Sequence, residues 1–148
     1  MVQSTITEWP AIQARLTALI RAFGLLEPER TPRGQPLSPS AAHALLELSS
    51  NERLTQTELG ARLRLEKSTV SRLVGQLDER GWIERRRAER DGRLIMLGLT
   101  DSGRSLAERV AAARATYFGR LAERIPAARH AELLDSLDLL VEILHEQR

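Results

Sequence analysis

Apolar residues recur every three to four positions at both ends of the chain, which is the spacing of one face of an α-helix. This pattern predicts one helix from about Thr7 to Leu26 and another that Pro126 opens near the C-terminus. The second helix carries leucines at close to heptad spacing. A single small domain cannot easily cover so much apolar surface, so we expect the two helices to form a dimer interface. The residues expected in that interface are Trp9, Ile12, Leu16, Leu133, Leu137, Leu140 and Leu144.

Between these two helices the chain begins with a loop. Four prolines and a glycine lie between Glu27 and Pro39, a composition that forbids regular structure. Ser38 is expected to cap the helix that follows. Thr55 and Glu58 then have the spacing of a capping box, which predicts a helix from Gln56 to about Leu63.

The next helix, from about Lys67 to Arg80, has two faces of different chemistry. Its apolar face is predicted to be buried and consists of Val70, Leu73, Val74 and Leu77. Its opposite face carries short or hydrogen-bonding residues suited to close approach to base edges: Ser68, Ser71, Arg72, Gly75 and Gln76. Gly81 is the predicted left-handed stop of this helix. On the helix before it, Ala61 is expected where the two helices cross closely.

Two strands are predicted after this helix, over Trp82–Arg87 and Arg93–Leu99, because apolar residues alternate in the second of them. The dipeptide Asp91-Gly92 between them predicts a hairpin turn. Thr100 is expected to cap a further helix, whose apolar stripe consists of Leu106, Val110, Ala113, Tyr117 and Leu121.

The basic residues gather in the middle of the chain. Residues 62–93 contain nine Arg and one Lys against six acidic residues, whereas residues 122–148 contain three Arg against six acidic residues. This distribution is expected if only the middle meets nucleic-acid phosphates, although ordinary solvated faces carry such charge runs too.

Composition also excludes several classes of protein. The chain has no cysteine, which excludes disulfides and thiol-based redox sensing. It shows neither a secretory signal nor an apolar run long enough for a membrane span, so we expect a cytoplasmic protein without a membrane partner. The histidines lack metal-ligand spacing, and neither a phosphate-binding loop nor a nucleophile elbow occurs. No metal, cofactor or catalytic residue is therefore expected.

Three phrases of the sequence resemble the MarR family of bacterial winged-helix transcription regulators: LTQTELGARL, KSTVSRLVGQLDERGWIERR and DGRLIMLGLTDSGR. The order of the predicted helices also agrees, so the resemblance covers essentially the whole chain. It implies a single mainly α-helical domain over residues 1–148 with a small β-hairpin wing. Residues 38–100 would form a winged helix-turn-helix DNA-binding lobe. The flanking residues 1–30 and 101–148 would form a dimerisation lobe.

The resemblance assigns DNA contacts to the helix from Lys67 and to the wing. The residues that match the family's major-groove and phosphate contacts are Ser68, Thr69, Ser71 and Arg72, and Gln76 lies on the same face. Arg72 is the candidate for bidentate guanine recognition. The alternative is that Arg72 pairs with Asp78 or Glu79 on the helix surface.

In the wing, Arg90 or Arg93 is expected to enter the minor groove. Gly92 stands where many relatives carry a charged residue, so the resemblance does not decide between the two arginines. Asp91 either orients Arg93 through an ion pair or simply makes the turn. Strand alternation allows only one or two of three consecutive arginines to direct their charge towards DNA phosphates, and these are Arg85, Arg86 and Arg87.

Family likeness also implies a small, often aromatic or phenolic, effector bound between the lobes. Candidate residues for an aromatic or anionic ligand are Arg21, His43 and Tyr117, unless these are ordinary surface or interhelix residues. The resemblance thus implies a homodimeric repressor that binds a palindromic operator in double-stranded DNA, and we expect its half-sites to lie ~34–36 Å apart. Two alternatives are a winged-helix module that binds a protein partner without DNA, and a small ligand-modifying enzyme.

Overall fold

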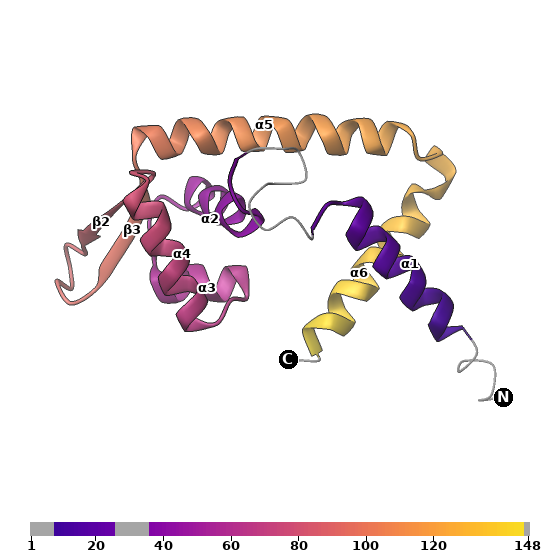
Figure 1. The fold of residues 1–148 in the computed structure, drawn as a ribbon, viewed down its shortest axis with the longest axis horizontal. Coiled ribbons are helices and arrows are strands. Elements are labelled where there is room, and N and C mark those ends of the chain that lie inside the picture. The colour runs from indigo at the N-terminus through magenta and orange to yellow at the C-terminus, as the bar shows by residue number, and fades with distance from the viewer. Residues whose placement is uncertain (1–7, 26–35, 147–148) are drawn as a thin grey trace. The chain divides into compact units, whose positions relative to one another are not determined.

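A computed structural model describes residues 8–25 and 36–146, and its elements follow the predicted order (Figure 1). The helices are α1 (Trp9–Ala22), α2 (Pro39–Ser50), α3 (Gln56–Leu63), α4 (Lys67–Glu79), α5 (Asp101–Glu123) and α6 (His130–Glu146). The strands are β1 (Leu54–Thr55), β2 (Ile83–Arg87) and β3 (Ile95–Leu99). The predicted fold class, mainly helical with a small hairpin wing, is confirmed.

Contacts divide the chain into two compact units. The first ends at Ala111 and the second starts at Ala112, so the boundary falls inside α5. The first unit also contains α1, and we call its remaining described residues, from 36 to Ala111, the winged lobe. The second unit consists of the C-terminal part of α5, a short 3₁₀ turn (Ala127–Arg129) and α6. The sequence-based lobe limits at residues 38, 100 and 101 remain a prediction.

The prediction for α1 was too long at its C-terminal end. The helix stops at Ala22, and Gly24 takes a left-handed φ of 72°, which a helix cannot continue. The predicted limits Thr7 and Leu26 lie outside the described residues, as does most of the predicted proline-rich loop.

Side-chain caps start α2 and α3 where the sequence predicts them. Ser38 Oγ accepts a hydrogen bond from the backbone N–H of Ala41 at 3.2 Å. In α3 the Thr55 hydroxyl accepts from the Glu58 backbone N–H at 3.2 Å, and the Glu58 carboxylate accepts from the Thr55 backbone N–H at 2.7 Å. The hydrogen bonds from Thr55 favour the charged carboxylate and hold the pKa of Glu58 below its usual range.

The close crossing of α3 and α4 is at Gly60, not at Ala61 as predicted. A Cβ at Gly60 would lie 2.9 Å from Val70 Cγ2, tighter than real side chains allow. Ala61 is exposed. The helix period explains the error, because the residue next to a buried position already turns towards solvent.

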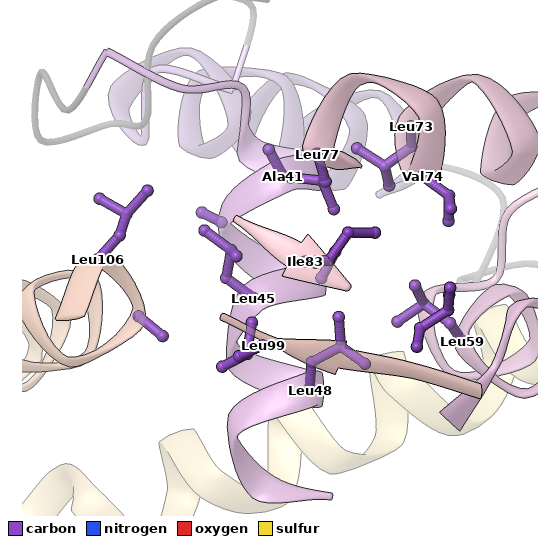
Figure 2. Packing of buried hydrophobic residues seen from close by; sticks show 14 of the residues in the cluster. Ala41, Leu45, Leu48, Leu59, Leu73, Val74, Leu77, Ile83, Leu99 and Leu106 are labelled. Atoms are coloured by element: carbon purple, nitrogen blue, oxygen red, sulfur yellow. The ribbon is translucent and has the colours of Figure 1, made fainter. Parts of the chain in front are cut away.

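The buried side of α4 is as predicted, and it joins a core that includes every other element of the winged lobe. Figure 2 shows side chains from α2, α3, α4, β2, β3 and α5 pointing toward one another. Leu45 and Val74 have no exposed surface. The start of α5 is part of this core through Leu106, Ala107 and Val110. Gly103 permits it, because a Cβ there would collide with the Trp82 carbonyl.

The sheet has three antiparallel strands in the order β1-β3-β2, whereas the sequence predicted only two. β1 was missed because two residues are too few for a period-2 pattern. β2 and β3 begin one and two residues later than predicted. The register places Arg85 opposite Leu97, Arg86 opposite Met96 and Arg87 opposite Ile95.

The connection between β2 and β3 is longer than a two-residue hairpin. The backbone N–H of Ala88 donates to the Leu94 carbonyl at 2.9 Å and closes a loop over residues 88–94. Within it, the Leu94 N–H donates to the Asp91 carbonyl at 3.0 Å, so Asp91 begins the turn. Gly92 is not among the described residues with positive φ, which a type I′ turn would need.

The second unit has no buried residue in α6. Leu140 is half-buried, and seven other large apolar side chains of this helix are exposed in the single chain: Leu133, Leu134, Leu137, Leu139, Val141, Ile143 and Leu144. None of the described helices is long and apolar enough to span a membrane.

Candidate nucleic-acid interface

The outer face of α4 is a continuous row of small polar and hydrogen-bonding residues. Ser68, Ser71, Arg72 and Gln76 are exposed, and Thr69 and Gly75 are half-buried beside them. The row exists because Val70, Leu73, Val74 and Leu77 anchor the opposite face in the core. Short side chains at i, i+3 and i+7 leave the helix backbone accessible to a flat partner surface.

Arg72 has no ion pair in the described part of the chain, so the predicted alternative for it is not observed. Asp78 is instead bound by Arg85, whose Nε donates to Asp78 Oδ2 at 2.8 Å. Glu79 has no ion pair among the described residues either. The Arg72 guanidinium therefore keeps all five of its donors available for an external acceptor.

An open groove of about 490 Å³ lies between α3 and α4, next to this row. It is lined by Gln56, Thr57, Gly60, Ala61, Leu65, Lys67 and Val70. Sequence reasoning missed Gln56, Thr57 and Lys67 as candidate contacts. A signal was present, because the capping box places Gln56 and Thr57 in the first turn of α3, where backbone N–H groups point outwards and suit a phosphate.

The strand register separates the three consecutive arginines of β2. Arg85 and Arg87 lie on the face that Leu97 and Leu99 turn towards the core, and Arg86 lies on the other face. Arg87 Nη1 donates to the Gly92 carbonyl at 3.3 Å, so it braces the wing loop. Arg86 pairs with Glu84 on its own face at 2.9 Å.

Arg90 and Arg93 are exposed in the wing loop, and neither forms an ion pair within the described residues. Asp91 does not hold the Arg93 guanidinium. Its Oδ1 accepts from the Arg93 backbone N–H at 3.0 Å, which is the turn-forming alternative. The choice between Arg90 and Arg93 as the minor-groove residue remains a prediction.

The candidate effector residues lie on three helices. Arg21 is exposed on α1 and His43 is exposed on α2. Tyr117 lies on the part of α5 that belongs to the second unit, with its ring centroid 5.1 Å from that of Phe118. An effector pocket that uses the three residues together remains a prediction. No cluster of metal-binding side chains occurs among the residues that the structure describes.

The predicted dimer residues are exposed to different degrees in the single chain. Trp9 and Ile12 on α1 are more than half exposed, and Leu144 on α6 is 61% exposed. Leu16, Leu133, Leu137 and Leu140 are less so. Such exposure is expected of the residues of an apolar interface in the absence of the partner chain. The interface itself remains a prediction.

The paired helices α3 and α4, the exposed row on α4 and the hairpin after it define a winged helix-turn-helix protein. Residues 35–94 match the MarR family. The chain is also 30% identical over 104 residues to the organic hydroperoxide resistance transcriptional regulator of Bacillus subtilis (strain 168), covering 70% of this chain and 69% of that protein. The chain therefore belongs to the MarR family of transcriptional regulators, as the sequence predicted. These relatives are regulators and not enzymes, which removes the enzyme alternative.

Solved structures with the same fold include Streptococcus pneumoniae FabT in complex with DNA, at 22% identity and a TM-score of 0.83 over 95% of this chain and 99% of that one. Another is the PcaV transcriptional regulator from Streptomyces coelicolor in complex with its natural ligand, at 23% identity and a TM-score of 0.69 over 93% of this chain and 94% of that one. At these identities the similarity establishes the shared fold.

Proposed function

We propose that this protein binds double-stranded DNA as a homodimer and represses transcription from a palindromic operator. The observation that carries the proposal is the exposed row on α4, with Arg72 unpaired among the described residues, in the same lobe as a wing that carries Arg90 and Arg93. The row supplies donors for base edges, and the wing supplies cations for a groove flank. The DNA complex of FabT supports this use of the fold.

The apolar surface of α6 supports the homodimer. At 100° per residue, its eight apolar side chains spread over roughly 220° of the helix circumference, about twice the stripe that one packing neighbour needs. The acidic residues Asp135, Asp138, Glu142 and Glu146 occupy the remaining arc. A helix of this kind is stable in water only when more than one helix covers it, and a second copy of the chain supplies such cover by two-fold symmetry.

Two copies related by a two-fold axis present two α4 helices to successive major grooves. The matching DNA site is a palindrome with half-sites ~34–36 Å apart. Repression is the mode that the family resemblance implies. Such a regulator shares a compartment with the chromosome, so we place it in the cytoplasm.

We further propose that a small aromatic or anionic ligand releases the DNA, using Arg21, His43 and Tyr117. The ligand complex of PcaV supports a ligand site in this fold. Benzoate is the simplest probe, because it combines an aromatic ring with one negative charge. Release of operator DNA by benzoate in wild type but not in Arg21→Ala or Tyr117→Phe is the expected result, and equal release by all three proteins contradicts the residue assignment.

The experiment that tests DNA reading starts from the genomic fragments that the purified protein selects. On the selected duplex, Arg72→Ala should lose about 1–3 kcal/mol of discrimination against a scrambled duplex, because a bidentate base contact is removed. Arg86→Ala should weaken binding on both duplexes alike and reduce the salt dependence. Unchanged sequence preference in Arg72→Ala contradicts the assignment of Arg72. Binding that is insensitive to salt would favour the protein-partner alternative instead.

A further inference from the structure

Asp78 joins the recognition helix α4 to the wing. It lies in the last turn of α4, and its Oδ2 accepts a hydrogen bond from Arg85 Nε in β2 at 2.8 Å. The pair spans the tight turn at Gly81, where the chain leaves the helix at a φ of 70°. Both side chains are 42% exposed, so the pair lies at the surface of the lobe and not in its core.

The same face of the hairpin carries the contact that braces the wing loop. Arg87 follows Arg85 on the core-facing side of β2 and donates to the Gly92 carbonyl at 3.3 Å. Asp91, the neighbour of Gly92, fixes the turn through the Arg93 backbone N–H at 3.0 Å. Separate polar contacts thus hold both ends of β2: one ties its start to the last turn of α4, and the other ties its end to the loop that carries the exposed arginines.

An aspartate at position 78 is explained neither by its contribution to stability nor by electrostatic attraction to DNA. An ion pair at this exposure contributes about 0.2–1 kcal/mol to stability at most. A carboxylate beside a DNA-binding face also opposes binding, because it repels phosphates. What the pair supplies is geometry, since a charge-assisted bond at 2.8 Å fixes the direction of the Arg85 side chain.

We propose that Asp78 is a positioning residue that sets the angle of the wing relative to α4 through Arg85, so that the α4 row and the wing tip reach their grooves together. This inference rests on the proposed DNA-binding function. It treats Arg85 as an internal brace and leaves Arg90 and Arg93 as the wing cations that meet DNA.

The chain offers a matched control in Glu79, the next residue on α4, which is exposed and has no ion pair in the described ranges. If both acids merely repel phosphates, Asp78→Asn and Glu79→Gln should each strengthen binding to the selected duplex. The proposal predicts opposite signs. Asp78→Asn should weaken binding about 5- to 10-fold, whereas Glu79→Gln should leave it equal or slightly tighter.

A double-mutant cycle tests whether Asp78 acts through Arg85. Arg85→Gln combined with Asp78→Asn should bind no more weakly than Arg85→Gln alone, because the second substitution removes a partner that is already lost. Thermal midpoints within about 2 °C of wild type would show that folding is intact. If Asp78→Asn binds as tightly as Glu79→Gln, Arg85 is a plain phosphate ligand and the proposal is overturned.

A second measurement needs no DNA and separates this inference from the proposed function. Because the chain has no cysteine, spin labels can be placed with Thr57→Cys on α3 and Glu89→Cys in the wing loop. The distance distribution between the labels should broaden on adding Asp78→Asn and stay narrow on adding Glu79→Gln. If wild type binds no DNA but this contrast is seen, the proposed function fails while the brace stands. Equal distributions in all three proteins overturn the brace itself.

Discussion

The winged lobe and the second unit are both built from amphipathic helices, yet they differ in how far their apolar side chains are buried. In the winged lobe, leucines such as Leu45 and Leu59 are completely buried by neighbours from the same chain. In α6 of the second unit, Leu134 and Leu144 are 60% and 61% exposed. The winged lobe thus has its hydrophobic core buried within a single chain, whereas the second unit leaves an apolar surface uncovered. We therefore expect the second unit, and not the winged lobe, to depend on the proposed homodimer.

The largest expected effect comes from charging the apolar arc of α6. Leu137→Asp together with Leu144→Asp should convert the proposed dimer to monomers, since two carboxylates cannot be buried unpaired. Affinity for a two-half-site duplex should fall by about 100-fold or more, because the link between the two binding events is lost. Light scattering and DNA titration measure both effects.

Ala131 provides the control for that pair, because it lies on the acidic side of α6. Ala131→Asp adds the same group outside the apolar arc and should leave the dimer intact. A monomeric wild type, or a double variant that stays dimeric, would break the contrast between the two regions.

A core truncation in the winged lobe is expected to act independently of assembly. Leu45→Ala should lower the free energy of unfolding by about 2–5 kcal/mol, because it opens a cavity among fully buried side chains. Leu134→Ala removes the same atoms from an exposed position of α6. Urea titrations at two protein concentrations should show a constant loss for Leu45→Ala and only a concentration-dependent change for Leu134→Ala. The reverse pattern would mean that α6, and not the lobe, holds the intrinsic stability.

A glycine on the exposed row sharpens the distinction between stability and function. Nothing lies within 4 Å of a Cβ built at Gly75, although glycine in a helix costs about 1 kcal/mol relative to alanine. Gly75→Ala should therefore stabilise the lobe by up to about 1 kcal/mol and yet weaken DNA binding, if the space serves the approach of DNA. Gly119 on α5 is equally open, and Gly119→Ala should leave the α4 contacts to DNA unchanged. Tighter DNA binding by Gly75→Ala would remove the functional explanation for this glycine.

The smallest effect is expected at the capping box of α3. The pKa of Glu58 is lowered by hydrogen bonds from Thr55, so its contribution to stability is present above the unfolded carboxyl pKa and is lost as pH falls through the folded value. Between roughly pH 5 and pH 3, the Glu58→Gln variant should therefore lose less stability than wild type, by a few tenths of a kcal/mol. Thermal melts across that range measure it. Parallel pH profiles for the two proteins would show that the box does not act through the charge of Glu58.

Local signals in the sequence predicted most element boundaries, because each boundary depends on a few neighbouring residues. Ser38, the Thr55–Glu58 box and Gly81 all act within one helical turn, and the structure has them where the sequence predicted. Errors arose where the deciding partner is distant. β1 forms only because β3 pairs with it, and Gly60 rather than Ala61 is the close crossing only because Val70 packs there.

The sequence by itself determined the class of this protein. The spacing of apolar residues in helices, the helix caps and the arginine-rich hairpin each depend on residues that are close together along the chain. It also marked Arg72 and the wing arginines as candidates. Only the tertiary structure decided which arginines are available. Arg85 and Arg87 are engaged within the lobe because strand pairing turns them towards α4 and the wing loop. Arg72 has no ion pair within the described residues, since Asp78 and Glu79 lie six and seven positions along the same helix, beyond the spacing of three or four at which side chains meet. The charge of an arginine is a property of the residue itself, but whether that charge is available to contact DNA depends on which groups the fold places beside it.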